Sequence, residues 1–410
     1  MKIKTNELKY CYNDLSIVPA AISTITSRSE CNPFYGDDML PIFTAPMATI
    51  ANIHNMDIWK ENHIMPIIPR NVFSNKLKDE HDNILYRYNN LKKYLINGDW
   101  VALSLKEFTY LFASDTFTEL DKDVTYRVCV DLANGHMQSL YRTINYAKKL
   151  AHKRGYTLII MTGNIANPET YKWICENAEV DYIRVSIGSG FNCITSTQTA
   201  IHYPVASLIN ECAEIQANME LLNKYDVVKS IPYIVADGGI RGYSDVIKAL
   251  ALGANYVMIG SEFTRLLESA GKIEAYEETG TKLANIYGMH DSGEVFSNHS
   301  VHTIFNIWSK NTSEDVKRDF IDRMKNIYKT SYGMSTKMAQ DLINPNAKKK
   351  TSEGCVKKVE VKETIKQWSD NMISYLKSAM SYTSKRDIKD FVGRVDLVLN
   401  SNNAYNSVNK

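Results

Sequence analysis

Eight short apolar runs recur along the chain, separated by segments in which polar residues predominate. The runs cover residues 40–47, 64–68, 100–104, 127–131, 157–161, 182–185, 232–236 and 255–259. Between several runs the apolar positions recur at helical spacing, as in residues 204–222 and 243–252. Near-continuous apolar strands that alternate with helices are typical of a parallel sheet buried on both faces.

Polar residues and glycines directly follow several of these runs, which narrows the fold class. The clusters are Ala133-Asn134-Gly135, Thr162-Gly163-Asn164, Asp237-Gly238-Gly239 and Gly260-Ser261. Eight strands with such clusters predict an α/β fold, the (β/α)8 TIM barrel, in which the functional site lies at the carboxyl ends of the strands. A doubly wound open sheet is the alternative that the pattern leaves open.

The pattern changes after Ser261. Residues 262–331 are polar and partly helical, and they are more numerous than a plain barrel connection requires, so we interpret them as an enlarged insertion. Residues 332–362 predict a mobile catalytic flap, with a helix at 338–343 and an edge strand at 357–361.

The end of the chain completes one domain. An amphipathic helix is expected at 363–380, and the polar tail at 400–410 is expected to be frayed. A length of 410 residues suits an α/β barrel with insertions, and 44% apolar residues suffice for a large core. We therefore interpret residues 1–410 as a single barrel domain.

Charge and cysteine usage exclude several classes of protein. The 48 basic and 46 acidic residues give a net charge of +2, which is not the excess of positive charge typical of proteins that bind nucleic acid. The seven cysteines include no CxxC pair, which argues against a zinc site or a disulfide framework and indicates a reducing compartment. No apolar run reaches ~18 residues, and residues 1–7 lack the apolar core of a signal peptide. We therefore expect a cytoplasmic protein without a membrane span.

A glycine-rich loop follows the sixth run and ends in a cysteine: Gly188-Ser-Gly190-Phe-Asn-Cys193-Ile-Thr195. Glycines at 188 and 190 allow backbone conformations that other residues resist, and they let a ligand approach. A cysteine placed at such a loop suits a nucleophile. A tight turn with an inert, half-buried thiol explains the stretch equally well.

Other polar residues at the strand ends extend the argument for a nucleotide site. Asp237 and Asn164 suit sugar hydroxyls, and Thr195 and Glu353 suit proton transfer. Backbone N–H groups at helix starts after the last two strands suit a phosphate; these are at Gly238, Gly239, Gly260 and Ser261. Each piece alone has a structural explanation, as a turn, a helix cap or a solvated charge. Their joint occurrence indicates covalent chemistry on a nucleotide base.

These motifs resemble those of the IMP dehydrogenase and GMP reductase family, and the resemblance extends from Ser27 to Phe391. The motifs are Val130-Asp-Leu-Ala-Asn-Gly135, Thr162-Gly-Asn164, Gly188-Ser-Gly-Phe-Asn-Cys-Ile-Thr195, Ala236-Asp-Gly-Gly239, Val257-Met-Ile-Gly-Ser261 and Tyr332-Gly-Met334. Three features are more similar to the reductase branch: Asp-Leu-Ala-Asn-Gly after the fourth strand, Ser352-Glu353-Gly354, and residues 376–383.

The resemblance implies a role for each matching residue. Cys193 would attack C2 of the purine of GMP, and Thr195 and Glu353 would handle protons as ammonia leaves and IMP forms. NADPH or NADH would deliver hydride near the cofactor-binding residues Asp131, Asn134 and Gly135. The substrate-binding residues would be Asn164 and Asp237 at the ribose, Gly239, Gly260, Ser261 and Tyr332 at the phosphate, and Met334, Ser335, Ser352 and Gly354 at the base. Carbonyls of Gly188, Gly190 and Cys193 would hold a monovalent cation, potassium, and the protein would form a homotetramer.

Several positions depart from the family pattern. The expected serine after Gly190 is Phe191, the expected glycine at the end of the sixth strand is Ser186, and the expected aspartate after Met47 is Ala48. The expected basic pair after the second strand is Pro69-Arg70, and the expected arginine before the flap glutamate is Lys350. Phe191 removes one hydroxyl donor and adds bulk beside the phosphate.

Two other functions remain as alternatives to a GMP-reductase-like enzyme. The first is a compact IMP dehydrogenase without regulatory domains, whose water would be activated by an arginine-tyrosine pair on the flap. No such pair lies between Tyr332 and Glu353, which counts against this alternative. The second is a nucleotide-binding barrel without turnover, in which Phe191 spoils the phosphate pocket.

Overall fold

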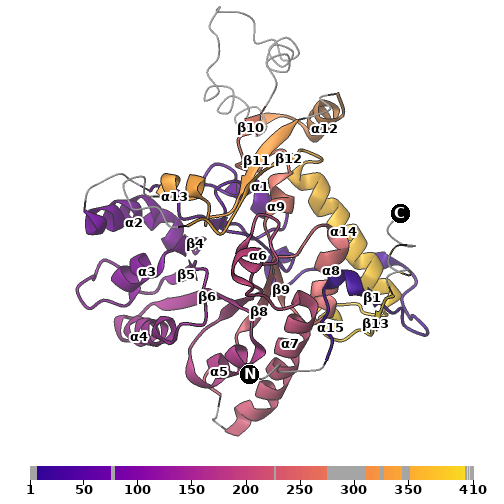
Figure 1. Ribbon diagram of the computed structural model, residues 1–410, viewed down its shortest axis with the longest axis horizontal. Helices are drawn as coiled ribbons and strands as arrows, with labels where there is room; N and C mark the ends of the chain where they lie inside the picture. Colours follow the sequence, from indigo (N-terminus) through magenta and orange to yellow (C-terminus); the bar gives the residue numbers. More distant parts are fainter. Residues whose placement is uncertain are drawn as a thin grey trace, which may run out of the picture.

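The computed structural model describes residues 7–74, 79–225, 228–274, 311–323, 327–343, 351–401, 404 and 406. Eight parallel strands form its central sheet, in the order β2-β9-β8-β7-β6-β5-β4-β3 (Figure 1). Their bounds are β2 Ile42–Thr44, β3 Ile67–Ile68, β4 Trp100–Leu103, β5 Thr125–Val130, β6 Thr157–Ile165, β7 Tyr182–Val185, β8 Tyr233–Asp237 and β9 Tyr256–Ile259. Each of the eight predicted strands is present.

The two ends of this sheet meet, so that the barrel nearly closes. Phe43 of β2 forms a parallel bridge with Met65, which lies two residues before the start of β3. The backbone N–H of Thr44 donates to Met65 O at 3.0 Å, and the N–H of Met65 donates to Ile42 O at 3.0 Å. The prediction of a TIM barrel is thus confirmed, and the doubly wound open sheet is excluded because that fold leaves two unpaired sheet edges.

Aromatic side chains at the amino-terminal ends of the strands fill the barrel interior. The ring of Trp100 meets the rings of Phe43 and Tyr182 edge to face, at centroid distances of 5.5 and 5.3 Å. Tyr256 adds a ring 5.4 Å from that of Tyr182. Edge-to-face pairs of this kind add to the stabilisation that burial alone provides. We call Phe43, Trp100, Tyr182 and Tyr256 the aromatic plug.

Helices surround the barrel on its outer face. The longer ones are α2 Glu80–Ile96, α3 Leu105–Phe112, α4 Gln138–Arg154, α5 Pro168–Asn177, α7 Val205–Leu222, α8 Tyr243–Ala251 and α14 Ile365–Tyr382; the shorter ones are α1 Met56–Glu61, α6 Thr195–Thr199, α9 Ser261–Thr264 and α15 Ile388–Phe391. In α14 the buried residues Trp368, Met372 and Leu376 share one face, as the helical spacing requires. Among the described residues, no helix is both long and apolar enough to cross a bilayer.

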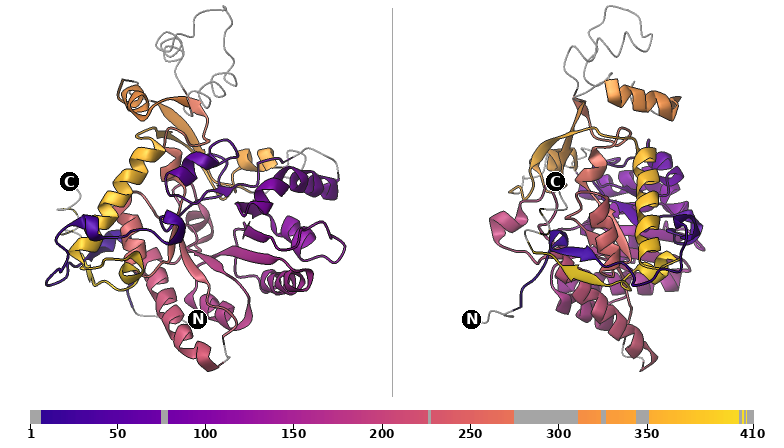
Figure 2. Two further views of the ribbon diagram at one scale, coloured as in Figure 1. Left: turned by 180° about the vertical axis from the view of Figure 1, so that it is seen from behind. Right: turned by 90° about the vertical axis from the view of Figure 1, so that its right-hand side faces the viewer.

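Two small antiparallel sheets accompany the barrel (Figures 1 and 2). β1 (Leu15–Ile17) pairs with β13 (Leu397–Leu399) and joins the two ends of the chain. β10 (Ile273–Glu274), β11 (Tyr328–Tyr332) and β12 (Val356–Glu360) form the second sheet, at the top of Figure 1. The pattern predicted β12 as an edge strand but did not predict β11.

The described part of the predicted insertion and flap also includes helices α12 (Glu314–Arg323) and α13 (Lys337–Ile343). Residues 275–310 and 324–326 of the predicted insertion lie outside the described residues, as do residues 344–350 of the flap. Most of the tail at 400–410 does so too.

Candidate active site

The carboxyl ends of β6, β7 and β8 bring an amide and a carboxylate together. Asn164 lies near the end of β6, and Asp237 is the last residue of β8. The side-chain N–H of Asn164 donates to Asp237 Oδ2 at 2.8 Å and to the carbonyl of Ser186, after β7, at 2.9 Å. Because parallel strands end at one edge of the barrel, two residues far apart in the sequence are adjacent here. Their arrangement suits recognition of a sugar diol.

Charged residues, of which Arg184 is buried and Asp131 and Arg70 are partly buried, lie next to this pair. Asp131, after β5, forms ion pairs with Arg70 and Arg184, each at 3.0 Å. Arg184 is 3% exposed, and its Nε lies 3.8 Å from Asp237 Oδ2. Burial acts to raise the pKa of Asp131, but the charges of Arg70 and Arg184 outweigh it and lower the pKa below its ordinary value. Burial raises the pKa of Asp237, and the charge of Arg184 opposes that rise.

Arg184 was not among the residues singled out from the sequence. A single arginine within an otherwise apolar strand, 182–185, was the available signal. A buried arginine requires counter-charges, which here are Asp131 and Asp237. Arg70, which departs from the family pattern as part of Pro69-Arg70, supplies the second cation.

The residues predicted to bind the cofactor follow β5 at the same edge. Asn134 is exposed, and its side-chain oxygen accepts from the N–H of His136 at 3.0 Å. Gly135 is buried, and its N–H donates to Asn164 O at 2.9 Å. A Cβ at Gly135 would lie 2.8 Å from that oxygen, so no larger residue fits this approach. Asp131 is held by the two arginines, which leaves the exposed amide of Asn134 as the group open to a ligand.

The cysteine loop leaves β7 with an unusual backbone. Ser186 has a φ of 112° and Gly188 a φ of 79°, both in the region that favours glycine. A Cβ at Gly188 would lie 2.6 Å from the Cβ of Ser196. Ser186 occupies the position where the family pattern has glycine, and its hydroxyl forms a hydrogen bond with that of Ser189. The loop then turns through a bond from Cys193 N to Gly190 O at 2.9 Å.

Three predicted catalytic residues meet at the end of this loop. The partly exposed thiol of Cys193 donates to Thr195 Oγ1 at 3.3 Å. The hydroxyl of Thr195, at the start of α6, donates to Glu353 Oε2 at 2.7 Å. A thiol, a hydroxyl and a carboxylate in this order provide a path along which a proton can move to or from a group attacked by the sulfur.

Backbone pairing places Glu353 on the cysteine loop. The N–H of Ile194 donates to Glu353 O at 2.9 Å, and the N–H of Cys355 donates to Asn192 O at 2.9 Å. Between these bonds, Cys193 and Gly354 form an antiparallel bridge. The residues that precede β12 are therefore paired with the loop as a short ribbon.

The residues predicted to bind phosphate and base follow β8, β9 and β11 or belong to the segment that precedes β12. Gly239 follows β8, Gly260 and Ser261 lie between β9 and α9, and Tyr332 ends β11. Burial raises the pKa of Tyr332, so its hydroxyl remains a hydrogen-bond donor at neutral pH. The remaining base-edge residues are Met334 and Ser335, after β11, and Ser352, whose Oγ donates to the Gly354 carbonyl at 2.7 Å.

Gly354 lies in close contact with Ser335, since a Cβ at Gly354 would be 2.9 Å from Ser335 Oγ. Phe191 is 40% exposed beside the ribbon, and its ring lies under the ammonium of Lys357. The sequence did not single out Lys357, because one lysine in a lysine-rich segment carries no distinct signal.

The predicted cation ligands lie within one turn, but two of them already accept a hydrogen bond. Gly188 O accepts from Ser196 Oγ at 3.0 Å, and Gly190 O accepts from Cys193 N at 2.9 Å. A carbonyl oxygen has a second lone pair, so these bonds are compatible with a bound cation. Among the described residues, no cluster of three or more His, Cys, Asp and Glu side chains could hold a metal ion.

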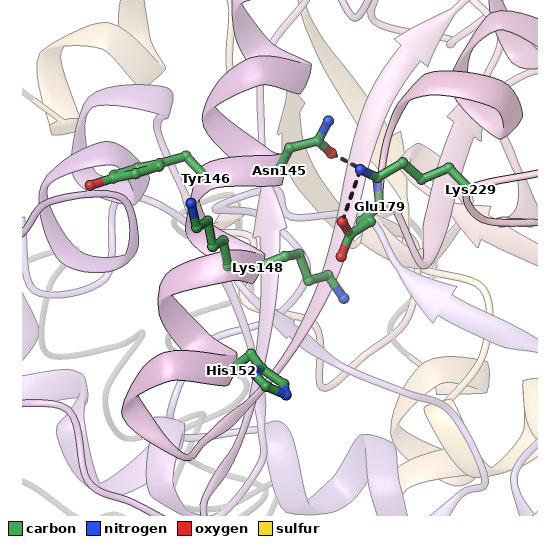
Figure 3. Close-up of a pocket in the computed structure, with 7 residues that line it drawn as sticks. Asn145, Tyr146, Lys148, His152, Glu179 and Lys229 are labelled. Atoms are coloured by element: carbon green, nitrogen blue, oxygen red, sulfur yellow. Dashed lines mark hydrogen bonds and ion pairs between the residues drawn. The ribbon is translucent and has the colours of Figure 1, made fainter.

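A basic hollow of about 560 Å³ lies elsewhere on the barrel (Figure 3). Its lining comes from α4 and from the segments that precede β7 and β8: Asn145, Tyr146, Lys148, Lys149, His152, Glu179 and Lys229. Lys148 and Lys229 are paired with acidic residues, Asp181 at 2.6 Å and Glu179 at 3.2 Å. The hollow lies towards the amino-terminal ends of the strands, away from Cys193, and it is not the candidate active site.

The chain is also similar to several known proteins. The family model described as "IMP dehydrogenase / GMP reductase domain" matches residues 9–323. The chain is 29% identical to the GMP reductase of Streptococcus suis over 284 residues, which cover 68% of this chain and 76% of that protein. It is 30% identical to the GMP reductase of Streptococcus gordonii over 283 residues, 68% of this chain and 76% of that protein. It is 32% identical to GMP reductase 1 of Homo sapiens over 162 residues, 40% of this chain and 42% of that protein.

Proposed function

Because this chain belongs to the IMP dehydrogenase and GMP reductase family, whose members are oxidoreductases that bind purine nucleotides and use NAD(P), we propose that it is a GMP-reductase-like enzyme. It reductively deaminates GMP, or a related guanine nucleotide, to IMP with NADPH. The observation that carries the proposal is the hydrogen-bonded chain from Cys193 through Thr195 to Glu353. The similar GMP reductases support the reductase over the dehydrogenase.

The reaction assigns one task to each residue of that chain. The sulfur of Cys193 bonds to C2 of the purine and makes that carbon tetrahedral. Thr195 and Glu353 deliver the proton with which the 2-amino group leaves as ammonia. The nicotinamide cofactor, when bound, supplies the hydride to C2. Departure of the Cys193 sulfur then gives IMP, so that two easier steps replace one difficult one.

The rest of the site holds the nucleotide for these steps. Asn164 and Asp237 bind the ribose, and Gly239, Gly260, Ser261 and Tyr332 bind the phosphate. Met334, Ser335, Ser352 and Gly354 contact the base. Asn134 is the exposed group that would contact the cofactor, with Asp131 and Gly135 shaping the same edge. Fixed positions for the reacting groups contribute to the rate because less freedom remains to be lost in the transition state.

One assay tests the proposal. The protein is mixed with GMP and NADPH, and separately with IMP and NAD, and the absorbance of the reduced cofactor is followed. We expect loss of NADPH with GMP. A gain of NADH with IMP would instead assign a compact dehydrogenase, and calorimetric binding of nucleotide without either change would assign a non-catalytic barrel.

Family membership also leads us to propose three properties of the assembled enzyme. It is a cytoplasmic homotetramer, and a potassium ion bound by the carbonyls of Gly188, Gly190 and Cys193 shapes the cysteine loop. Sedimentation velocity measures the assembly. Replacing potassium by sodium in the GMP assay should lower the rate if that ion is held at the loop.

A further inference from the structure

One lysine connects the flap to the cysteine loop through two contacts. The Nζ of Lys357, on β12, lies 3.7 Å from the centroid of the Phe191 ring. The same Nζ donates to the Phe191 carbonyl at 2.7 Å. An ammonium over an aromatic face is attracted by the negative face of the ring, and a charged donor strengthens the hydrogen bond. Both contacts therefore hold one side chain to one residue of the loop.

These contacts lie at the end of the ribbon that carries the catalytic residues. The ribbon has two backbone hydrogen bonds, from Ile194 N to Glu353 O and from Cys355 N to Asn192 O. Such short two-stranded pairings are marginal by themselves in water. The last backbone bond of the ribbon joins Cys355 to Asn192. Lys357 and Phe191 add a side-chain attachment beyond that bond.

Asn192 holds the loop from its other face. Its side chain is 5% exposed, and its N–H donates to Ser331 Oγ on β11 at 2.7 Å. Ser331 is itself fully buried, and its hydroxyl lies 3.4 Å from Thr264 Oγ1 of α9. The loop is thus anchored to β11 by Asn192. On its other side, Cys355 Sγ lies 3.6 Å from Asn192 O, and from β12 itself Lys357 adds its two contacts with Phe191.

We propose that Lys357 is a positioning residue that, together with Phe191, fixes the flap strand to the cysteine loop and so keeps Glu353 within reach of Thr195. We call this pair the latch. The role in turnover rests on the proposed function, but the latch itself is a property of the protein without ligand. The latch also gives a role to the aromatic ring at position 191, where the family pattern has serine. The ring binds the ammonium of Lys357, and a serine has no ring to do so.

Deuterium exchange of the unliganded protein tests the latch directly. Peptides that cover residues 191–195 and 353–357 report the amides of Ile194 and Cys355, which are the two that cross the ribbon. In Lys357→Met the cation and the donor are lost while the stem is kept, and we expect these amides to exchange about tenfold faster, the effect of losing roughly one such contact. Lys357→Arg keeps both contacts and should exchange as the wild type does.

The matched control is Lys358→Met, since successive residues of a strand point to opposite faces. It removes an equal charge from β12 but keeps both contacts of Lys357, so the exchange of both amides should rise much less than in Lys357→Met. Unchanged exchange in Lys357→Met, or an equal rise in Lys358→Met, would overturn the latch.

Kinetics then test the positioning role. With GMP and NADPH, Lys357→Met should lower kcat about tenfold with KM for GMP nearly unchanged, and Lys357→Arg should restore kcat. Faster exchange with an unchanged kcat would overturn the positioning role. If the wild-type protein does not turn over GMP, the proposed function fails, whereas the exchange experiment still decides whether the latch exists.

Discussion

At the amino-terminal end of the barrel, the rings of Phe43, Trp100 and Tyr182 meet edge to face, whereas at the carboxyl end Cys193, Thr195 and Glu353 form a chain of polar contacts. The first group consists of strand residues, which the sheet itself places. The second comes from a loop, a short helix and a flap that is remote in the sequence. The same barrel thus separates stability from chemistry, because each end can be altered with little effect on the other.

Replacing the sulfur gives the largest expected effect, at the polar end alone. Cys193→Ala should lower turnover of GMP by about 10⁴-fold or more, because no covalent adduct can form. The melting temperature should remain close to that of the wild type, since the thiol is only partly buried. Turnover and thermal unfolding are measured on the same preparation. An active Cys193→Ala protein would rule out the covalent route.

Truncation in the aromatic plug should give the opposite result. Trp100 is 7% exposed, and Trp100→Ala leaves a cavity that costs about 3–5 kcal/mol of unfolding free energy. Denaturant unfolding measures this loss. At a temperature where the variant is fully folded, its kcat with GMP should stay within about twofold of the wild type. A large fall in kcat of the folded variant would show that the two ends are coupled.

Glu353→Gln sharpens the comparison within the polar end. The amide keeps the shape of the carboxylate but cannot exchange protons, so we expect kcat to fall by about 10²-fold. Binding of GMP, measured by calorimetry, should change little. An equal loss in binding and in kcat would identify Glu353 as a binding residue instead.

Acid should affect the polar end through the ion pairs of Asp131, and we expect this effect to be the smallest. The pKa of Asp131 is lowered in the folded protein, because the charges of Arg70 and Arg184 outweigh burial. The ion pairs therefore stabilise the protein fully above the unfolded-state pKa of about 3.9, and this contribution is lost as the pH falls through the lower folded pKa.

Unfolding free energies measured from neutral pH to pH 3 check this expectation. They should fall more steeply for the wild type than for Asp131→Asn, which has no carboxylate to protonate. Equal slopes for the two proteins would mean that Asp131 does not contribute to the acid dependence.

Much of the barrel could be predicted because its signals are local. Runs such as 100–104 and 182–185 are apolar apart from Ser104 and Arg184, since a strand of a barrel is covered on both faces. The eight strands and the helices at 204–222 and 243–252 followed from this pattern. β11 could not be predicted in the same way, because Tyr328–Tyr332 reads Tyr-Lys-Thr-Ser-Tyr, and its buried residues are Lys329 and Ser331. Their partners are carbonyls and hydroxyls brought in by the fold, such as Leu267 O and Ser269 O for Lys329.

Candidate chemistry was visible in the sequence where glycine, cysteine and threonine are close together, at 188–195. Its third member was proposed only from the order of motifs, since Glu353 lies in a segment rich in lysine. Arg184 and Lys357 were not singled out from the sequence, because the role of a charged side chain depends on the groups that face it in the folded protein.

The order of apolar runs and the polar residues after them predicted an α/β barrel, with a doubly wound sheet as the alternative, and indicated the carboxyl ends of the strands as the place of the chemistry. Periodicity suffices for this because burial is repeated at every strand. The folded structure added the contact between Glu353 and Thr195, the arginines that neutralise Asp131, and the contact of Lys357 with Phe191. Those contacts join residues remote in sequence, and no local pattern encodes the distance between them.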